Sequence, residues 1–279
     1  MQGLLSDHRR RRLLTWWGRS FRPLPAPAAA STLLFCDCEG HHGGPEGERF
    51  GDTGVDRLLS LLDRHRCRIT FNVVADLCRT HPERVRRIAA AGHEIACHGW
   101  RHERPRELHG ALLDEMLKNA RREFASLGIS PTGFRSPESA WSIELTRRLP
   151  RHGFTWNAEH DRAAGPYGIV GGLIRVPVHT DDWDLVDGTA DAAALIAKWR
   201  GMVGAAHTAR RSLSVGLHDW VVGRDPIFAA LLDDWLSQTA PLGTPIPSSP
   251  GTGFPSSSGG TGFPAGPSML LSDRAKGRI

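Results

Sequence analysis

Short apolar runs of β-like sequence alternate with helical patterns between residues 31 and 238, and this alternation limits the fold more than any other feature. Repeated β-then-α units favour a parallel sheet with right-handed crossovers, closed or nearly closed into a barrel. The sequence predicts an α/β domain with its chemistry at the carboxyl ends of the strands. The expected strands cover residues 32–38, 68–74, 94–97, 133–135, 174–178 and 213–217. The expected helices cover residues 55–64, 83–91, 108–127, 144–151, 190–203 and 226–236.

Two flanking segments differ in composition from the domain at 31–238. Residues 1–30 end in the run PLPAPAAA and are expected to be a lead-in segment. Residues 239–279 are rich in Gly, Pro, Ser and Thr, and they contain the run GTGFP twice. Such a composition buries too little apolar surface to offset the entropy of ordering. We therefore expect a flexible tail after the domain.

The formal net charge of +5 raises the question of a nucleic-acid partner. Part of this charge is the run of four arginines at positions 9–12, and the other arginines are mixed with Asp and Glu along helical stretches such as 82–91. Mixed charges of this kind are typical of solvated helix faces. No nucleic-acid partner is expected.

The N-terminal arginines precede an apolar stretch that Gly18 and Arg19 interrupt. A secretory signal needs about 7 to 15 apolar residues, and a membrane span needs about 18, which no segment here reaches. The cytoplasm is the expected location, with no membrane partner. Five scattered cysteines, an odd number, agree with a reducing compartment. Cys36 and Cys38 lack a second pair at zinc-ribbon spacing, so both are expected to be strand side chains.

The first expected strand ends in the run Asp37-Cys38-Glu39-Gly40, which holds two acidic residues. Residues two apart on a strand point to the same side, so both carboxylates would share one site. A pair of solvated loop acids is the alternative.

His98 and His102 are four residues apart in the run GHEIACHGWRH at 92–102. On a helical turn this spacing stacks two imidazoles on one face, within reach of one divalent ion. The spacing after His93-Glu94 is one residue too long for the H-E-x-x-H of metalloproteases. Two ordinary surface histidines are the alternative.

Three further polar runs follow expected strands. In FRSP at 134–137, Arg135 could orient a carboxylate or could be a surface arginine before a turn. Asp182 stands beside Trp183, a platform for a sugar ring or acyl group, although Asp182 could equally cap the next helix. His218 follows the apolar run SLSVGL, and a core histidine with satisfied hydrogen bonds is its alternative reading.

The order of these five runs, each at a strand end of one α/β body, resembles the polysaccharide deacetylase family, also called NodB-homology proteins or carbohydrate esterase family 4. The resemblance spans about residues 32–236. It is most specific in GHEIACHGWRH at 92–102 and in LHDWVVGRDPIFAALLDDWL at 217–236. The resemblance implies a distorted (β/α) barrel.

Members of this family hold a divalent metal, usually zinc, with one carboxylate and two histidines. The matching residues here are Glu39, His98 and His102. Most members carry two adjacent aspartates in the first run, whereas this chain has Asp37 and Glu39 separated by a cysteine. The resemblance implies Asp37 as general base and Glu39 as metal ligand, with an exchange of these two roles left open.

The resemblance also implies His218 as the general acid that protonates the leaving amine, with Asp182 or Asp219 as its carboxylate partner. Arg135 would hold Asp37 ionised and in position. The residues expected to contact the substrate are Trp100, Ser136, Pro137, Trp183, Asp219 and Trp220.

These roles predict a zinc-dependent hydrolase that removes the acetyl group from an N-acetylglucosaminyl moiety. Because the cytoplasm is the expected location, the predicted substrate is a soluble glycoconjugate. The Ala-, Arg- and Gly-rich composition favours an intermediate of glycopeptide-antibiotic biosynthesis. The alternatives are a peptidoglycan or chitin-oligomer deacetylase, a metal-free hydrolase of cyclic amides, and an inactive binding module of the same fold.

Overall fold

Nine strands form one sheet in this computed structural model, which describes residues 22–23 and 31–239. Their order is β1-β7-β8-β6-β5-β4-β3-β2-β9, and all neighbours are parallel except β7, which pairs antiparallel with β8 and β1. The predicted parallel sheet is thus confirmed over its main body. The strands are β1 (Arg22–Pro23), β2 (Thr32–Cys38), β3 (Thr70–Val73), β4 (Glu94–Cys97), β5 (Gly133–Arg135), β6 (Trp156–His160), β7 (Tyr167–Gly168), β8 (Ile174–Val178) and β9 (Leu213–His218).

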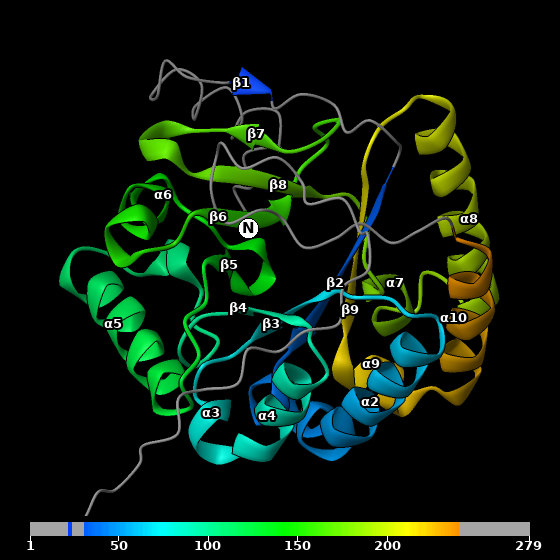
Figure 1. Cartoon of the computed structure of the whole chain (residues 1–279), viewed down its shortest axis with the longest axis horizontal. Coiled ribbons are helices and arrows are strands. Elements are labelled where there is room, and N and C mark those ends of the chain that lie inside the picture. Colours follow the sequence, from blue (N-terminus) through cyan, green and yellow to red (C-terminus); the bar gives the residue numbers. More distant parts are fainter. Residues whose placement is uncertain (1–21, 24–30, 240–279) are drawn as a thin grey trace, which may run out of the picture.

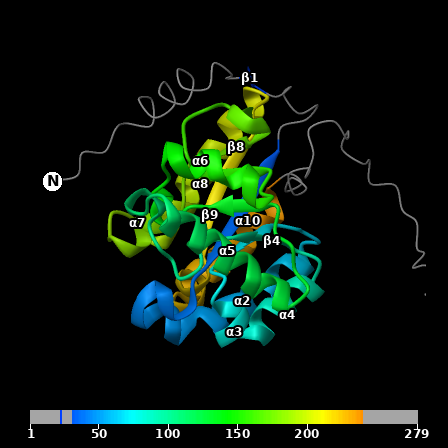
Figure 2. The same ribbon diagram turned by 90° about the vertical axis from the view of Figure 1, so that its left-hand side faces the viewer.

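Helices connect the strands and lie around the sheet (Figure 1). In Figures 1 and 2, α2, α3 and α4 gather at the end of the molecule opposite β1. No helix of the described ranges is both long and apolar enough to span a membrane. The α-helices are α2 (Gly44–Arg64), α3 (Leu77–Thr80), α4 (Pro82–Ala90), α5 (Ala111–Ser126), α6 (Ile143–Arg148), α7 (Trp183–Val186), α8 (Ala192–Thr208), α9 (Asp219–Arg224) and α10 (Pro226–Gln238). The 3-10 turns are η1 (Gly40–Gly43), η2 (Pro105–Glu107), η3 (Pro137–Ser139), η4 (Leu149–His152) and η5 (Val170–Gly172).

The two ends of the parallel sheet meet. Thr180, just after β8, forms a parallel bridge with Val215 of β9. The N–H of His179 donates to Ser214 O at 3.0 Å, and the N–H of Gly216 donates to Thr180 O at 2.9 Å. The parallel strands therefore close into the distorted (β/α) barrel that the sequence predicted.

Strand β2 separates the barrel interior from the core beneath the helices. Phe35 packs in one buried cluster with Trp156, whereas Leu34 and Cys36 belong to the larger core that includes the helices. Asp37 is two residues beyond Phe35, so it points into the barrel at the carboxyl end of the strand. Both cysteines of the first run are buried strand side chains, as predicted, and all five cysteines are free.

Helix α2 begins at residue 44, well before the helix predicted for 55–64. The run GPEGERFGDTG is rich in glycine and has low helix propensity, so no local pattern there predicts a helix. Packing against α9 makes the run helical, since a Cβ at Gly54 would lie only 1.7 Å from Asp219 O. The close approach of α2 and α9 fixes the start of α9, which carries Asp219 and Trp220.

The predicted elements do not include the strands β1, β6 and β7 or the short helices α3, α7 and α9. Strand β6 reads WNAEH, and its polar residues Asn157 and Glu159 are fully buried. Glu159 Oε1 accepts hydrogen bonds from Ser136 Oγ at 2.6 Å and from Asn157 Nδ2 at 3.2 Å. Arg175 Nε of β8 donates to Asn157 Oδ1 at 3.1 Å, whereas the buried Glu159 Oε2 has no hydrogen-bond partner. No apolar run marks the strand. The predicted lead-in at 1–30 and tail at 239–279 lie almost entirely outside the described residues.

Candidate active site

Three of the predicted runs, those that hold Asp37 and Glu39, His98 and His102, and His218, meet at the carboxyl ends of the barrel strands. His98 Nε2 lies 3.8 Å from Asp37 Oδ2 and 3.7 Å from Glu39 Oε1. His218 Nε2 lies 4.0 Å and 3.9 Å from the same two oxygens. Parallel strands end at one edge of a barrel, which is why residues so distant in sequence meet here.

Glu39, His98 and His102 form a group suited to one metal ion. Their ligand atoms lie within 4.8 Å of one another, and Glu39 Oε1 is 2.9 Å from His102 Nε2. His98 Nδ1 is 3.0 Å from the carbonyl of Arg135, while its buried Nε2 has no hydrogen-bond partner. Trp220 Nε1 donates to Glu39 Oε2 at 3.1 Å and holds the carboxylate. Two imidazole nitrogens and one carboxylate match the donor set of a catalytic Zn²⁺ site.

The spacing of His98 and His102 predicts a helical turn, but the structure places the two histidines in a loop. His98 directly follows β4, and the chain turns at Gly99 and His102, where φ is 79° and 61°. Glu103 accepts hydrogen bonds from the backbone N–H groups of Trp100 and the next residue at 3.1 and 2.8 Å. This loop brings the two rings to a centroid distance of 5.1 Å. Glycine adopts positive φ at little cost, whereas His102 is held there by its surroundings.

Asp37 is held by two donors. Arg135 Nε donates to its two oxygens at 2.9 and 2.7 Å, and Asn72 Nδ2 donates to Oδ1 at 2.7 Å. Burial alone would raise the pKa of Asp37, but Arg135 and then His98 and His218 lower it below its usual value. The sequence analysis missed Asn72, although an amide inside the apolar run TFNV is a usable signal.

His218 is paired with Asp182, one of the two carboxylates that the sequence left open. His218 Nδ1 and Asp182 Oδ1 are 2.6 Å apart, and the backbone N–H of His218 donates to Asp182 Oδ2 at 2.8 Å. Burial would lower the pKa of His218, but Asp182, Glu39 and Asp37 raise it well above its usual value. Asp182 is the N-cap residue of α7, yet its side chain makes no capping hydrogen bond there.

Asp219, a predicted substrate contact, has no exposed surface. Its carboxylate accepts hydrogen bonds from Cys38 Sγ at 3.1 Å and from the backbone N–H of Trp220 at 2.8 Å. Arg84 Nη1 lies 3.9 Å away, and burial raises the pKa of Asp219 to about 7 against the effect of Arg84. The structure therefore places this carboxylate between β2 and α9, away from the opening.

The other predicted substrate contacts differ in how accessible they are. Trp183 is 48% exposed, and its ring centroid is 5.6 Å from His218 and 6.4 Å from Trp220. Trp100 is partly buried, whereas Ser136, Pro137 and Trp220 are buried. Ser136 Oγ is already bonded to Glu159. Trp183 is thus the one among these six that presents a large apolar face to solvent.

A second His–Asp pair was missed by the sequence analysis. His160 Nε2, at the end of β6, lies 2.9 Å from Asp181 Oδ2. Burial would raise the pKa of Asp181, but His160, His218 and Arg135 lower it below its usual value. Asp181 therefore adds negative charge near His218 and Arg135. No apolar periodicity marks β6, so the sequence offered no signal for His160.

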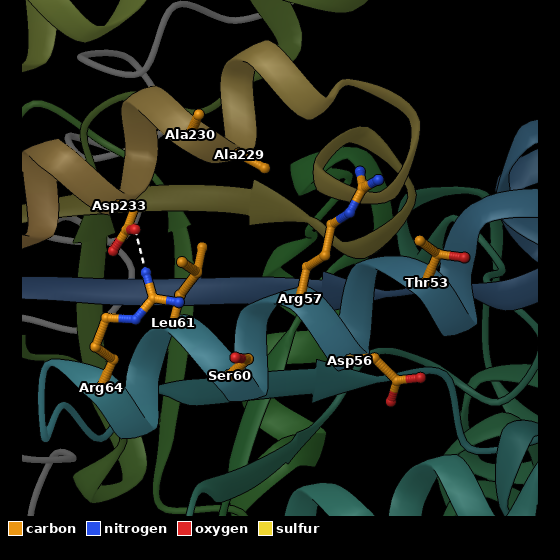
Figure 3. A pocket seen from close by; sticks show the side chains of 9 residues that line it. All are labelled: Thr53, Asp56, Arg57, Ser60, Leu61, Arg64, Ala229, Ala230 and Asp233. Atoms are coloured by element: carbon orange, nitrogen blue, oxygen red, sulfur yellow. Dashed lines mark hydrogen bonds and ion pairs between the residues drawn. The ribbon is translucent and has the colours of Figure 1, made fainter.

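A separate groove of about 520 Å³ lies between α2 and α10 (Figure 3). Its lining includes the ion pair of Arg64 with Asp233, and Arg57 donates to backbone carbonyls of α9 at 2.9 and 2.7 Å. Among the described residues that line this groove, none is a histidine or a cysteine. None of the predicted site residues lines this groove. The proposed metal ligands lie instead at the carboxyl ends of the barrel strands.

Comparisons with known proteins find similar sequences and similar folds. Residues 44–156 match the family described as polysaccharide deacetylase. The chain is 27% identical to a peptidoglycan deacetylase of Helicobacter pylori over 51% of this chain and 46% of that protein. It is 33% identical to a chitooligosaccharide deacetylase of Bradyrhizobium over 32% of this chain and 41% of that protein. The chain thus spans less than half the length of these curated relatives.

Solved structures share the fold. A Mycobacterium smegmatis protein assigned to the polysaccharide deacetylases aligns with a TM-score of 0.70 at 24% identity, over 78% of this chain and 86% of that one. PuuE allantoinase aligns with a TM-score of 0.64 at 22% identity, over 75% and 83%. A family 4 carbohydrate esterase from Streptomyces lividans aligns with a TM-score of 0.51 at 20% identity, over 76% and 87%. Over residues 44–156 this chain matches the polysaccharide deacetylase, or NodB-homology, family, and the solved structures above share its fold.

Proposed function

We propose that this protein is a metal-dependent hydrolase that removes the acetyl group from an N-acetylated amino sugar. One observation carries the proposal. A two-histidine, one-carboxylate group lies within 4.0 Å of a second carboxylate and of a third histidine that has its own aspartate. Metal-assisted amide hydrolysis uses these groups: a metal site, a general base and a general acid.

Glu39, His98 and His102 would hold the ion, and Zn²⁺ suits this donor set. The ion would supply Lewis-acid activation of water and of the acetyl carbonyl. Trp220 fixes the rotamer of Glu39 through its indole N–H, and the carbonyl of Arg135 orients the ring of His98. Such outer partners keep the ligands in position.

Asp37 accepts the proton of the attacking water. Arg135 Nε donates to both of its oxygens and Asn72 Nδ2 donates to Oδ1, while Oδ2 also lies 3.8 and 4.0 Å from His98 Nε2 and His218 Nε2. The lowered pKa keeps Asp37 ionised at neutral pH. Glu39 rather than Asp37 has the 2.9 Å contact to His102, which favours Glu39 as the ligand.

His218 donates a proton to the departing amine from Nε2. Asp182 holds Nδ1, so Nε2 is directed toward Asp37 and Glu39. A raised pKa keeps the imidazole protonated at neutral pH, as a general acid requires.

The substrate class rests on the relatives and on the exposed ring of Trp183. The curated relatives are named for peptidoglycan and for chitooligosaccharides. Trp183 offers a flat apolar face beside His218, which suits a pyranose ring. Within this class, the composition favours an N-acetylglucosaminyl glycopeptide intermediate, and this narrower substrate is part of the proposal.

The test measures bound metal and then turnover by mass spectrometry. Free N-acetylglucosamine, a chitin oligomer, an N-acetylglucosaminyl glycopeptide and allantoin are incubated with the protein, with and without added Zn²⁺. Zinc-dependent loss of one acetyl group from a glycan supports the proposal. Turnover of allantoin without metal, or no turnover of any N-acetyl substrate by metal-loaded protein, contradicts it. Turnover of the chitin oligomer but not the glycopeptide contradicts only the narrower substrate.

A further inference from the structure

A second cluster of metal-ligand side chains lies beside the proposed catalytic site. His41 and His42 belong to η1, the 3-10 turn that directly follows Glu39, and Asp76 follows β3. The ligand atoms of these three residues lie within 4.8 Å of one another. Neither histidine has a role in the proposed deacetylation, and the sequence analysis did not single them out.

We infer that His41, His42 and Asp76 form a second site for a divalent transition-metal ion, weaker than the first. The inference goes beyond the proposed function, since it concerns a separate ion. Imidazole nitrogens with one carboxylate favour Zn²⁺, Ni²⁺ or Cu²⁺ over Mg²⁺ or Ca²⁺.

The distances fit a shared ion. Asp76 Oδ2 is 3.7 Å from His41 Nε2 and 3.4 Å from His42 Nε2. In a tetrahedral site with donor distances of about 2.0 to 2.2 Å, neighbouring donors lie about 3.3 to 3.6 Å apart. The two rings lie side by side, with centroids 3.9 Å apart, so both Nε2 atoms face the same carboxylate oxygen.

Asp76 is fixed so that its Oδ2 contacts the two proposed histidine ligands, with a hydrogen bond to His42 Nε2 at 3.4 Å. Arg79 donates to the other oxygen, Oδ1, at 2.9 and 3.2 Å. The backbone N–H of Asp76 donates to Trp100 O at 2.9 Å, which ties it to the loop of His98 and His102. The Asp76 side chain is only 3% exposed, so its orientation is set before any ion arrives.

The surroundings also explain why this second site is the weaker one. Two arginines place positive charge next to a bound cation. Arg79 Nη2 lies 2.9 Å from Asp76 Oδ1, and Arg101 Nε lies 3.8 Å from the same oxygen. An ion in the neighbouring catalytic site adds further repulsion. The His41 side chain is 40% exposed, so solvent competes for the ion, whereas His42 is 14% exposed.

The experiment counts metal ions in tag-free protein. Metal-stripped protein is titrated with Zn²⁺ by calorimetry, and bound zinc is measured after equilibrium dialysis. We expect two ions per chain in the wild type and one in His41→Ala/His42→Ala. His98→Ala/His102→Ala should retain one, the weaker. Asp76→Asn should weaken the second ion on the order of tenfold or more. His81→Ala is the matched control, because its ring is 6.3 Å from His41 and outside the donor set.

Circular dichroism checks that each variant is folded, and the single variant His41→Ala, at an exposed position, repeats the test with less perturbation. If the wild type binds one ion and His41→Ala/His42→Ala still binds it, the inference is overturned. Two ions in that double variant also overturn it. If the wild type binds one ion that only His41→Ala/His42→Ala loses, the second site stands and the proposed catalytic metal site fails.

Discussion

Asp182 contacts His218 twice, through Oδ1 to the ring Nδ1 at 2.6 Å and through Oδ2 to the backbone N–H at 2.8 Å. One carboxylate thus fixes both the rotamer and the charge of the imidazole. The other ring nitrogen consequently faces Asp37 and Glu39. In the proposed reaction this contact decides whether a proton is available for the amine.

Asp182→Asn should lower kcat by about a hundredfold, because the amide keeps the shape of the carboxylate but not the charge that favours imidazolium. Bound metal should be unchanged, since Asp182 contacts none of the three proposed ligands. Steady-state kinetics and metal analysis check both points. Asp184→Asn, which removes only a surface ion pair with Lys198, is the control and should have near-normal kcat. Normal kcat in Asp182→Asn would remove His218 from the acid role.

Asp37→Asn and Glu39→Gln should separate the two roles that the sequence left open. Asp37→Asn should keep the metal and lose rate on the order of a hundredfold or more, as expected for a lost general base. Glu39→Gln should lose metal affinity, because Glu39 Oε1 is the oxygen nearest to His102. Metal analysis and kinetics are run on both variants. The reverse pattern would exchange their roles.

His98→Ala and His102→Ala should each lose the ion of the proposed catalytic site and the activity together, while keeping the fold. His98 Nε2 makes no hydrogen bond within the protein. Replacing His98 therefore removes the proposed ligand atom without breaking a hydrogen bond of that atom. Far-ultraviolet circular dichroism, metal content and deacetylation are compared with the wild type. Wild-type metal content in either variant would exclude that histidine as a ligand.

Trp183→Ala should reduce kcat/KM for an N-acetylated oligosaccharide by about threefold to tenfold, the range of a lost aromatic contact of about 0.5 to 1.5 kcal/mol. The exposed ring stands beside His218 but contacts no proposed ligand, so bound metal should not change. Leu112→Ala, another exposed apolar residue, on α5, is the control. Equal effects of the two substitutions would argue against a substrate platform at Trp183.

Glu94→Gln should stabilise the protein at alkaline pH and have little effect at pH 5. Burial raises the pKa of Glu94 to about 7, and Thr70 Oγ1 donates to its Oε2 at 2.7 Å. The pKa of Glu94 is higher in the folded than in the unfolded protein, where it is near 4.5. Its contribution to the free energy of unfolding is therefore complete below pH 4.5 and is lost as the pH rises through 7. Glutamine stays neutral and can still accept from Thr70.

Thermal unfolding of both proteins at pH 5 and pH 8 measures this effect. The expected gain at pH 8 is about 1 to 3 kcal/mol, since one pKa unit corresponds to about 1.4 kcal/mol. The neighbouring His93 has its pKa lowered to about 4 by burial and Arg68, but it is present in both proteins and cancels in the difference. A gain of the same size at both pH values would show that charge on Glu94 is not the cause.

Most of the site could be predicted because its residues sit in short local patterns. Asp37, Glu39, His98, Arg135 and His218 lie at or next to strand ends, which are visible in the sequence as the last residues of apolar runs. His102 lies four residues after His98 in the same short run. Their partners were not visible in the same way. Asn72 contacts Asp37 only because β3 pairs with β2, and no pattern near residue 72 reports that pairing.

The sequence by itself determined the α/β alternation, the positions of most strands and the chemical types at their ends, because propensity and periodicity depend on neighbouring residues. Tertiary structure alone decided the helix over the glycine-rich start of α2, the non-helical loop between His98 and His102, and the choice of Asp182 over Asp219. It also brought His41 and His42 to Asp76. Each of these depends on packing between segments distant in the chain, and such contacts form only when the barrel closes.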